Sequence, residues 1–330
     1  MKISVVIAVY NDLEIVQCVR SIYASDPVVD SEVIVVDDGS SEIDVESLLA
    51  GHGLEARVFT LEENRGPAYA RNFGVRQACG DIIFFIDADA QVYPNTLSGI
   101  LAHFIADFSV DAVTIAWSDT PLVDNFFNKF KAVETNYVIN EFWEKSFGSN
   151  GSAIKKQVFE AEGGFDEGFK SAHAEDFSFG LRLVDKEYNI VLDRAILMKN
   201  AYLDNFFWQG LRKYCLRAFL RAQVMQQTAH KVTTSYNSRK FKIAYALVLS
   251  TTALLAASFL GRELAFLGLV VYAAFFALNL GLYRRFFTKY GIAFSVRAVS
   301  FHFIYLATVS WSGMAGLGCG MLRNLKILNN

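Results

Sequence analysis

The stretch DIIFFIDADA, residues 81–90, decides the fold. Its first half is an unbroken apolar run, which predicts a strand that is buried on both faces of a sheet. The run ends in Asp87 and Asp89, whose side chains point the same way if the strand continues, because side chains alternate along a strand. Two neighbouring carboxylates need a positive partner. We therefore expect them to hold a divalent cation together with substrate phosphates, and the competing interpretation is an acidic surface turn.

The chain around this stretch alternates between strand and helix patterns. Apolar runs predict further strands, and residues at helical spacing predict the helices that separate them. This order implies parallel βαβ units, so the predicted fold class is α/β: a Rossmann-like, mostly parallel sheet followed by an all-α region. Strands are expected at 3–9, 32–36, 56–61, 81–90 and 111–117, and helices at 13–23, 43–53, 67–80 and 95–108.

A second acidic pair, Asp37 and Asp38, comes directly after the apolar run EVIVV. Ligands of parallel sheets bind at the carboxyl ends of the strands, so two acid pairs at such ends indicate a ligand site. One of these carboxylates would accept hydrogen bonds from a base or a ribose. The alternative interpretation is a simple Asx-type turn.

Two further motifs stand at predicted helix starts. NRGPAYARN supplies Arg65 and Arg71, and arginines at a helix amino terminus favour phosphate oxygens. HAEDFSFGLRL opens a helix with Glu175 and Asp176. Solvated arginines, and carboxylates that merely complement the helix dipole, are the alternative interpretations.

Charge and hydropathy divide the chain into two environments. The hydrophobic content is 53% and the mean hydropathy +0.26, both high for a purely soluble protein. All acidic residues but Glu263 lie before residue 205, whereas about half of the basic residues follow it. Because the basic part is also the apolar part, it favours a membrane surface with anionic lipid. The four cysteines lack metal-site or redox spacing and indicate reduced thiols. The apolar run at the start is shorter than that of a signal peptide and has no small-residue cleavage site, so we expect the first half to stay in the cytosol. We expect no nucleic-acid partner.

Three apolar stretches in the last third of the chain are long enough to cross a bilayer. A core helix pair is the alternative for the first two, and a re-entrant hairpin broken near Ser312 and Gly313 is the alternative for the third. The basic connector between the second and third stretches should face the cytosol. We therefore expect a multi-pass protein of the plasma (inner) membrane with its first domain on the cytoplasmic side. The expected spans are 243–260, 264–282 and 298–322, and the expected domains are 1–204, 205–240 and 241–330.

The segment that links the two parts, FFWQGLRKYCLRAFLRAQ, mixes apolar side chains with arginine and lysine. This pattern predicts an amphipathic helix lying on the bilayer, with Trp208 at the interface. A helix that packs on the first domain is the alternative.

Seven motifs in order (VVIAVYN, VIVVDDGS, NRGPAYARN, FIDADA, GSNGSAI, GGFDE and AEDFSFGLRL) resemble those of the family 2 inverting glycosyltransferases with the GT-A fold. The resemblance covers roughly residues 1–225. It implies a nucleotide-diphosphate sugar, here UDP-linked, as donor and a divalent metal, Mg²⁺ or Mn²⁺, as cofactor. The amphipathic segment and the apolar stretches add the expectation of a lipid or lipid-linked acceptor at the membrane.

Carried over position by position, the resemblance also implies a role for each motif residue. The metal ligands would be Asp87 and Asp89, the catalytic base Asp176, the donor-binding residues Tyr10, Asp38, Arg71, Asp87, Gly151 and Ser152, and the candidate acceptor or phosphate contacts Glu175, Gln209 and Arg212. A single base without an enzyme nucleophile implies one displacement and therefore inversion at the anomeric carbon.

Two other functions compete with this one. A catalytically silent nucleotide-sugar-binding module could recruit or regulate a membrane partner, although both the metal acids and the base are present. A transporter would need intramembrane acids, which the apolar stretches lack. The segment QGLRK has Lys213 where processive polysaccharide synthases have tryptophan, which counts against a processive polymer synthase.

Overall fold

The computed structural model describes the chain except residues 27–28, 144–146, 170–173, 203–206, 228–238 and 329–330. The chain divides into two compact units. The first unit comprises Met1–Leu122 and Val138–Ala201, and the second comprises Val123–Tyr137 and Tyr202–Asn330. The segment Val123–Tyr137 thus groups with the carboxyl-terminal helices, which the sequence did not indicate; the domain bounds at 204 and 240 stay a prediction.

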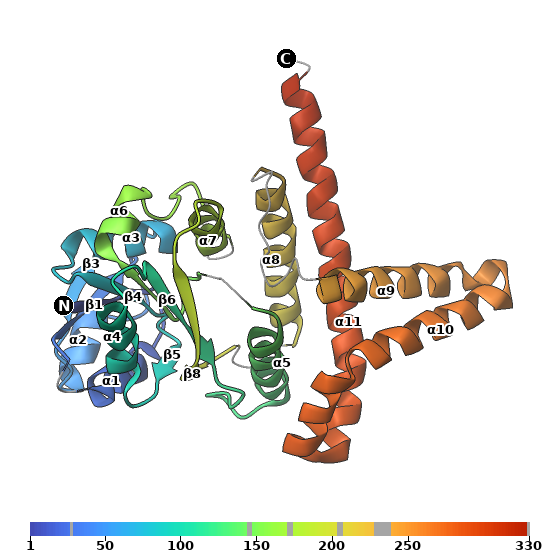
Figure 1. Cartoon of the computed structure of the whole chain (residues 1–330), viewed down its shortest axis with the longest axis horizontal. Helices are drawn as coiled ribbons and strands as arrows, with labels where there is room; N and C mark the ends of the chain where they lie inside the picture. The colour runs from blue at the N-terminus through green and yellow to red at the C-terminus, as the bar shows by residue number, and fades with distance from the viewer. Residues whose placement is uncertain (27–28, 144–146, 170–173, 203–206, 228–238, 329–330) are drawn as a thin grey trace. The chain divides into compact units, whose positions relative to one another are not determined.

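The first unit is built on an eight-stranded mixed sheet with the order β3-β2-β1-β4-β7-β6-β8-β5 (Figure 1). The expected α/β class is confirmed, and β3, β2, β1 and β4 are parallel neighbours. β7 pairs antiparallel with both β4 and β6, so the sheet is more mixed than expected. The strands are β1 Ile3–Val9, β2 Ser31–Asp37, β3 Arg57–Thr60, β4 Ile82–Phe85, β5 Ala90–Val92, β6 Ala112–Trp117, β7 Ser152–Lys155 and β8 Ile190–Asn200.

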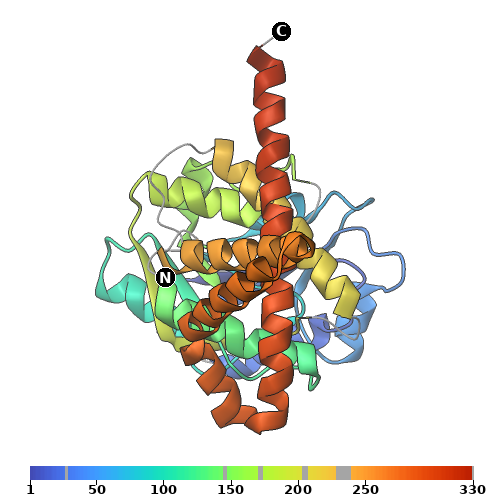
Figure 2. The same ribbon diagram turned by 90° about the vertical axis from the view of Figure 1, so that its right-hand side faces the viewer.

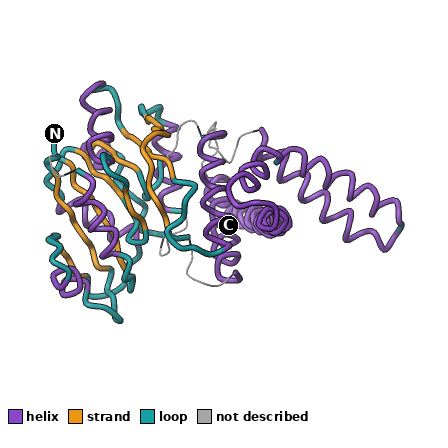
Figure 3. The backbone as a smooth tube through the Cα atoms, turned by 90° about the horizontal axis from the view of Figure 1, so that it is seen from below, coloured by secondary structure: helices purple, strands orange, loops and turns teal. Residues whose placement is uncertain are grey.

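Helices cover both faces of this sheet (Figure 3). Val5 and Ile7 of β1 pack into one apolar cluster and Val6 into the other, because successive side chains alternate. The first cluster lies under α1 Ile15–Ser25, α2 Val45–Gly51 and α4 Thr96–Ala106. The second lies under α3 Pro67–Gln77, α6 Lys156–Ala161 and α7 Glu175–Asp185.

The strand expected over residues 81–90 is shorter than predicted. β4 ends at Phe85, and Asp87 begins a turn that is closed by a hydrogen bond from the Ala90 amide to the Asp87 carbonyl at 3.1 Å. The chain then enters β5 at the far edge of the sheet. The turn therefore leaves the sheet at the carboxyl end of β4, as the acid pair suggested.

An irregularity in β8 is held by a single carboxylate. The β6–β8 register shifts between Ile115 and Ala116. On β8, Asp193 accepts hydrogen bonds from the Ala195 amide at 2.7 Å and from His103 Nε2 at 2.7 Å. Burial opposes ionisation of Asp193, but these hydrogen bonds outweigh it and lower the pKa of Asp193.

Replacing Asp193 by asparagine should lower the melting temperature of the first unit by about 2–4 °C at neutral pH, since a partly exposed charged hydrogen bond contributes about 1 kcal/mol. A lowered pKa contributes stability above the unfolded pKa of about 3.9 and loses it as the pH falls through the folded value. The difference between wild type and Asp193→Asn should therefore shrink below about pH 4. Thermal unfolding across pH checks this, and a difference that persists in acid would contradict it.

The second unit is helical (Figure 2). α8 packs against α11, and α9 and α10 run side by side as a hairpin. Besides the first part of α5 Phe126–Phe142, it contains α8 Phe207–Gln227, α9 Arg239–Ala256, the short 3₁₀ helix Ala257–Leu260, α10 Arg262–Leu278 and α11 Leu280–Leu328.

α11 includes both the basic connector and the third apolar stretch. The connector that follows the second apolar stretch is helical and belongs to α11. The backbone leaves helical geometry at Gly291, with φ of 77°, and runs as a helix through Ser312 and Gly313, where the alternative interpretation placed a re-entrant break. A positive φ is inexpensive only for glycine, which explains why the break falls there.

Two helices in the described part of the chain are long and apolar enough to cross a membrane: Arg239–Leu260 and Leu280–Met321. They correspond to the first and third expected spans. The second expected span corresponds to α10, which has 17 residues and thus stands at the lower end of the length that a bilayer requires.

A buried ion pair lies among aromatic rings in the second unit. The Lys131 ammonium donates to Glu134 Oε2 at 2.5 Å and to the Tyr305 hydroxyl at 3.3 Å. It also lies 4.5 Å from the centre of the Tyr214 ring. Burial alone would lower the pKa of Lys131, but Glu134 outweighs burial and raises it. The pair therefore ties α5 to α8 and α11.

The variant Lys131→Met should destabilise the second unit by about 3 kcal/mol, because it leaves the Glu134 carboxylate buried without its cation. Thermal unfolding in detergent measures the loss. Lys129→Met is the matched control, since Lys129 is more exposed and pairs with the exposed Asp124. Equal melting temperatures for the two variants would show that the buried pair contributes nothing.

Candidate active site

The candidate site gathers at the carboxyl ends of β1, β2 and β4 in the first unit. Tyr10, directly after β1, is half exposed, whereas Asp38, directly after β2, is buried. Asp87, after β4, is partly exposed. The parallel strands bring these three positions to one edge of the sheet, which is where ligands of such sheets bind.

The two acids of the turn lie together. Asp87 and Asp89 are partly exposed, and Ala88 between them is buried. The buried thiol of Cys18 contacts the Asp87 carbonyl at 3.5 Å. Burial raises the pKa of Cys18, and the negative charges of Asp89 and Asp87 raise it further.

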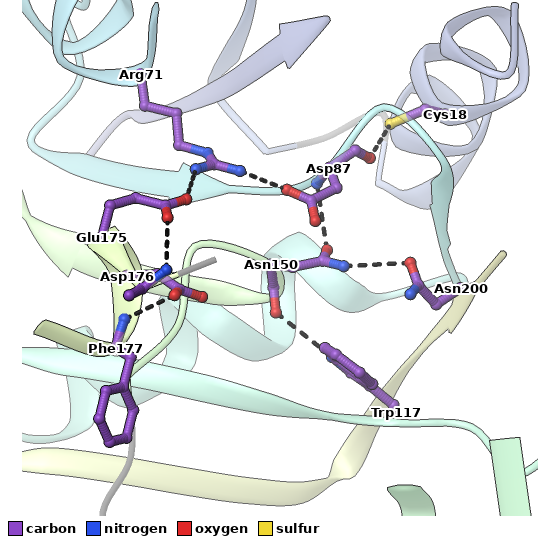
Figure 4. A network of polar contacts seen from close by, with 10 residues as sticks. Cys18, Arg71, Asp87, Trp117, Asn150, Glu175, Asp176, Phe177 and Asn200 are labelled. Atoms are coloured by element: carbon purple, nitrogen blue, oxygen red, sulfur yellow. Dashed lines mark hydrogen bonds and ion pairs between the residues drawn. The ribbon is translucent and has the colours of Figure 1, made fainter. Parts of the chain in front are cut away.

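Arg71 connects this turn to a distant helix (Figure 4). Its Nη2 donates to Asp87 Oδ1 at 2.8 Å, and its Nη1 donates to Glu175 Oε1 at 2.9 Å. Only 6% of the Arg71 side chain is exposed. Burial opposes its charge, but Asp87, Glu175 and Asp176 outweigh burial and raise the pKa of Arg71. One fork-shaped cation thus joins an acid of the turn to the first helical turn of α7.

The start of α7 carries a buried and an accessible acid. Glu175 is buried, and its Oε2 accepts from the Ala174 amide at 3.2 Å. Burial and the charge of Asp176 raise the pKa of Glu175, and Arg71 offsets them only in part. Asp176 is partly exposed, and its Oδ1 accepts from the Phe177 amide at 2.7 Å. Of the two carboxylates, Asp176 is the one that a ligand can reach.

Asn150, which the sequence did not single out, forms hydrogen bonds to three different segments: the acid turn, the end of β8 and the end of β6. Its Oδ1 accepts from the Asp87 amide, and its Nδ2 donates to Asn200 Oδ1, both at 3.2 Å. Its carbonyl accepts from Trp117 Nε1 at 3.4 Å (Figure 4). The only signal in the sequence was its place in the motif GSNGSAI.

Gly151 and Ser152 lie beside the cluster, where the chain enters β7. Gly151 has φ of +87°, and a Cβ there would lie 2.5 Å from the sulfur of Met198, so only glycine fits. The Ser152 hydroxyl is fully buried, where it bonds to Thr114 Oγ1 at 2.9 Å and accepts from the Gly148 amide at 3.2 Å. Both residues thus fix the loop that carries Asn150, and their expected contact with donor stays a prediction.

Asp38 is engaged by backbone amides. Its two oxygens accept from the amides of Arg65 at 2.8 Å and Gly66 at 2.9 Å. Burial raises the pKa of Asp38 more than these bonds lower it. Asp37 Oδ1 accepts from the Ser40 amide, so Asp37 forms the Asx-type turn of the alternative interpretation. The carboxylate of Asp38 thus shapes the loop before α3, and its contact with a nucleobase stays a prediction.

The remaining two predicted residues belong to the second unit. Gln209 and Arg212 both lie in α8. Arg212 is exposed, and the side chain of Gln209 lies outside the described part of the structure. Their expected contacts with acceptor or phosphate stay predictions.

The acid pair suits a hard divalent cation. Asp87 and Asp89 offer oxygen ligands only, and the side chains that the structure describes form no group of three or more His, Cys, Asp or Glu residues that could hold a metal ion. Two carboxylates without a complete protein cage match Mg²⁺ or Mn²⁺ that completes its shell with phosphate and water, and they do not match structural zinc. Arg71 occupies Asp87 Oδ1, and the other oxygen points away from Arg71 (Figure 4).

Comparison with known proteins finds similarity to glycosyltransferases in the first half of the chain. The family model described as Glycosyl transferase family 2 matches residues 4–162. The succinoglycan biosynthesis protein ExoO of Rhizobium meliloti (strain 1021) is 36% identical over 96 residues, which are 29% of this chain and 27% of that protein. The poly(ribitol-phosphate) beta-N-acetylglucosaminyltransferase TarS of Staphylococcus aureus (strain Mu50) is 33% identical over 119 residues, or 35% of this chain and 21% of TarS. The chain thus spans less than a third of these two curated relatives.

A solved structure extends the similarity in fold. The mannosyltransferase PcManGT from Pyrobaculum calidifontis, in complex with GDP-Man and Mn²⁺, superposes with a TM-score of 0.65 over 94% of this chain and 86% of that chain. The sequences are 21% identical, so this likeness concerns the fold. It confirms the GT-A fold that the motifs implied.

Proposed function

We propose that the whole protein is a metal-dependent, inverting glycosyltransferase that transfers a hexose-type sugar from a UDP-linked donor to a lipid or lipid-linked acceptor. The match of residues 4–162 to the model for Glycosyl transferase family 2 supports this proposal. One observation carries the proposal. The acid turn after β4 and the acidic start of α7 converge on the guanidinium of Arg71. Acids suited to a metal and an accessible carboxylate suited to a base therefore belong to one site.

The donor end of the site is assigned to Asp87 and Asp89. These two residues would hold Mg²⁺ or Mn²⁺, which when bound supplies Lewis-acid stabilisation of the departing diphosphate. The Asn150 side chain fixes the backbone at Asp87, so the carboxylate starts from a defined position. Preorganised groups aimed at developing charge are the most effective ones in catalysis.

The acceptor end is assigned to Asp176. Its carboxylate is partly exposed, whereas Glu175 beside it is buried against Arg71. Asp176 would take the proton of the acceptor hydroxyl while that oxygen forms a bond to the anomeric carbon and the bond to the leaving phosphate breaks. The attack comes from the opposite face in one displacement, which inverts the configuration.

The second unit supports a membrane-bound acceptor. It contains two helices that are long and apolar enough to span a bilayer, and α8 carries basic side chains beside apolar ones. We assign the protein to the plasma (inner) membrane, with its catalytic domain on the cytoplasmic side, because the basic segments flank the apolar ones. The similarity to a succinoglycan biosynthesis protein, ExoO, and to a poly(ribitol-phosphate) glycosyltransferase, TarS, favours a role in the synthesis of a polysaccharide or glycolipid.

The full chain in detergent or lipid vesicles allows a direct test. We expect it to release a nucleoside diphosphate from one member of a panel of UDP- and GDP-linked sugars when Mn²⁺ and a polyprenyl phosphate are present. Labelled sugar should appear in the lipid fraction, and a chelator should abolish the transfer. Tight binding of a nucleotide sugar without transfer to lipid would instead favour the silent binding module.

A further inference from the structure

We propose that Arg71 is a positioning residue that couples occupation of the acid turn by a divalent cation to the ordering of the base-bearing turn of α7. The inference rests on the proposed function for its catalytic meaning. The coupling itself, which links a cation at Asp87 to the order of the first turn of α7, can be measured without turnover.

The geometry of Arg71 favours this role over direct contact with the nucleotide. Its two terminal nitrogens each have a carboxylate partner, Asp87 at 2.8 Å and Glu175 at 2.9 Å. These partners lie 16 and 104 residues away in the sequence. With 6% of its side chain exposed, Arg71 offers little surface to a ligand. It is placed to act through the two carboxylates.

The two partners are not equivalent. The Asp87 side chain is 34% exposed and that of Glu175 only 2%. Asp87 is therefore the partner of Arg71 that would also hold a cation at the acid turn. Its negative charge would then be shared between the cation and the Arg71 guanidinium, which are both positive and repel each other. As the hold of Asp87 on Arg71 weakens, the guanidinium interacts more strongly with Glu175.

A stronger bond to Glu175 acts directly on the first turn of α7. Glu175 Oε2 accepts from the Ala174 amide, and the Ala174 carbonyl accepts from the Ser178 amide at 2.8 Å. The neighbouring Asp176 accepts from the Phe177 amide. Fixing Glu175 therefore orders the turn that carries Asp176. The base would reach its working position only once the cation, and with it the donor, is in place.

Hydrogen exchange of the Phe177 and Ser178 amides tests the coupling, with Mn²⁺ alone as the probe. In the wild-type full chain, saturating Mn²⁺ should slow their exchange about tenfold, the size expected when one charge-assisted hydrogen bond is strengthened. In Arg71→Lys the slowing should fall below about twofold, because an ammonium lacks the fork that spans two carboxylates. Binding of Mn²⁺ is followed separately by the spin resonance of the free ion, so that saturation is verified for each variant.

Two further variants complete the test. Glu175→Gln keeps the shape of the side chain but removes the charge that Arg71 would gain, so it should also lose the slowing; it replaces Arg71→Lys if that variant fails to fold. Arg76→Lys is the matched control, since Arg76 lies on the same helix and is exposed, and it should respond like the wild type. The proposal would be overturned if Mn²⁺ left the exchange rates of these amides unchanged in the wild type. It would also be overturned if the variants at Arg71 and Glu175 kept the full slowing.

The outcomes separate this inference from the proposed function. If no donor supports transfer but Mn²⁺ still slows exchange through Arg71, the enzymatic assignment fails and the coupling stands. If transfer occurs and the coupling is real, Arg71→Lys should lower kcat about tenfold or more while raising the donor KM only about twofold, because the defect lies in the base and not in donor binding. A raised donor KM with unchanged kcat would instead identify Arg71 as a direct donor contact.

Discussion

Asp176→Asn should abolish most transfer, lowering kcat by about 10²–10⁴-fold, while the affinity for donor and Mn²⁺ changes little. The amide keeps the size of the side chain but has no basic oxygen, so the acceptor hydroxyl loses its proton acceptor in the transition state. Because Asp176 is partly exposed, the substitution leaves no buried charge behind, and folding should be preserved. Initial rates with the labelled donor, together with donor binding by calorimetry, give both quantities.

The matched control is Asp185→Asn, since Asp185 is an exposed acid at the end of the same helix. It makes the same chemical change in α7 at the opposite end from the site, and its kcat should equal that of the wild type. Turnover by Asp176→Asn within a few-fold of the control would show that another group takes the proton. Glu175 is a poor substitute, because it is buried and bonded to Arg71.

The parts of the fold that follow from local pattern could be predicted from the sequence. The apolar runs before Asp37 and before Asp87 are long enough to identify buried strands, and the carboxyl-end rule for parallel sheets then places both acid pairs at one edge. Pro67 marked the first residue of α3 correctly, because proline is tolerated where a helix begins. β7 was not anticipated, since a strand of four residues in a loop rich in glycine and serine gives no periodic signal.

The long-range pairing in the site could not be predicted in the same way. The residues of the Arg71–Glu175 pair are 104 positions apart, and each alone looks like an ordinary charge at the start of a helix. Only the packing of α3 and α7 on the same face of the sheet brings them together. Asn150 was not predicted for a related reason. Its role depends on hydrogen bonds to Asp87, Asn200 and Trp117. The residue type alone does not indicate such contacts. The break of α11 at Gly291 likewise depends on tertiary context, because several glycines in that stretch offered the same backbone freedom.

Asp87→Asn should lower kcat/KM by about 10³-fold and weaken Mn²⁺ binding by at least tenfold. The reason is twofold. The variant removes one of the two anionic oxygen ligands that would hold the cation, and the metal supplies several kcal/mol of stabilisation to the leaving group. It also deprives Arg71 of one ionic partner, so the guanidinium should turn wholly to Glu175. Spin resonance of free Mn²⁺ and initial rates at increasing Mn²⁺ concentration measure the two effects.

Asp81→Asn provides the control on the same strand. Asp81 is exposed just before β4, where it accepts a hydrogen bond from the Lys2 amide at 3.0 Å, at the end opposite to the acid turn. Its Mn²⁺ affinity and rate should match the wild type. High Mn²⁺ should recover part of the activity of Asp87→Asn, since Asp89 remains as a ligand, and recovery should follow the occupancy measured by spin resonance. If Asp87→Asn bound Mn²⁺ as tightly as Asp81→Asn, the cation would have to be held elsewhere, and the acid turn would be no more than an acidic surface turn.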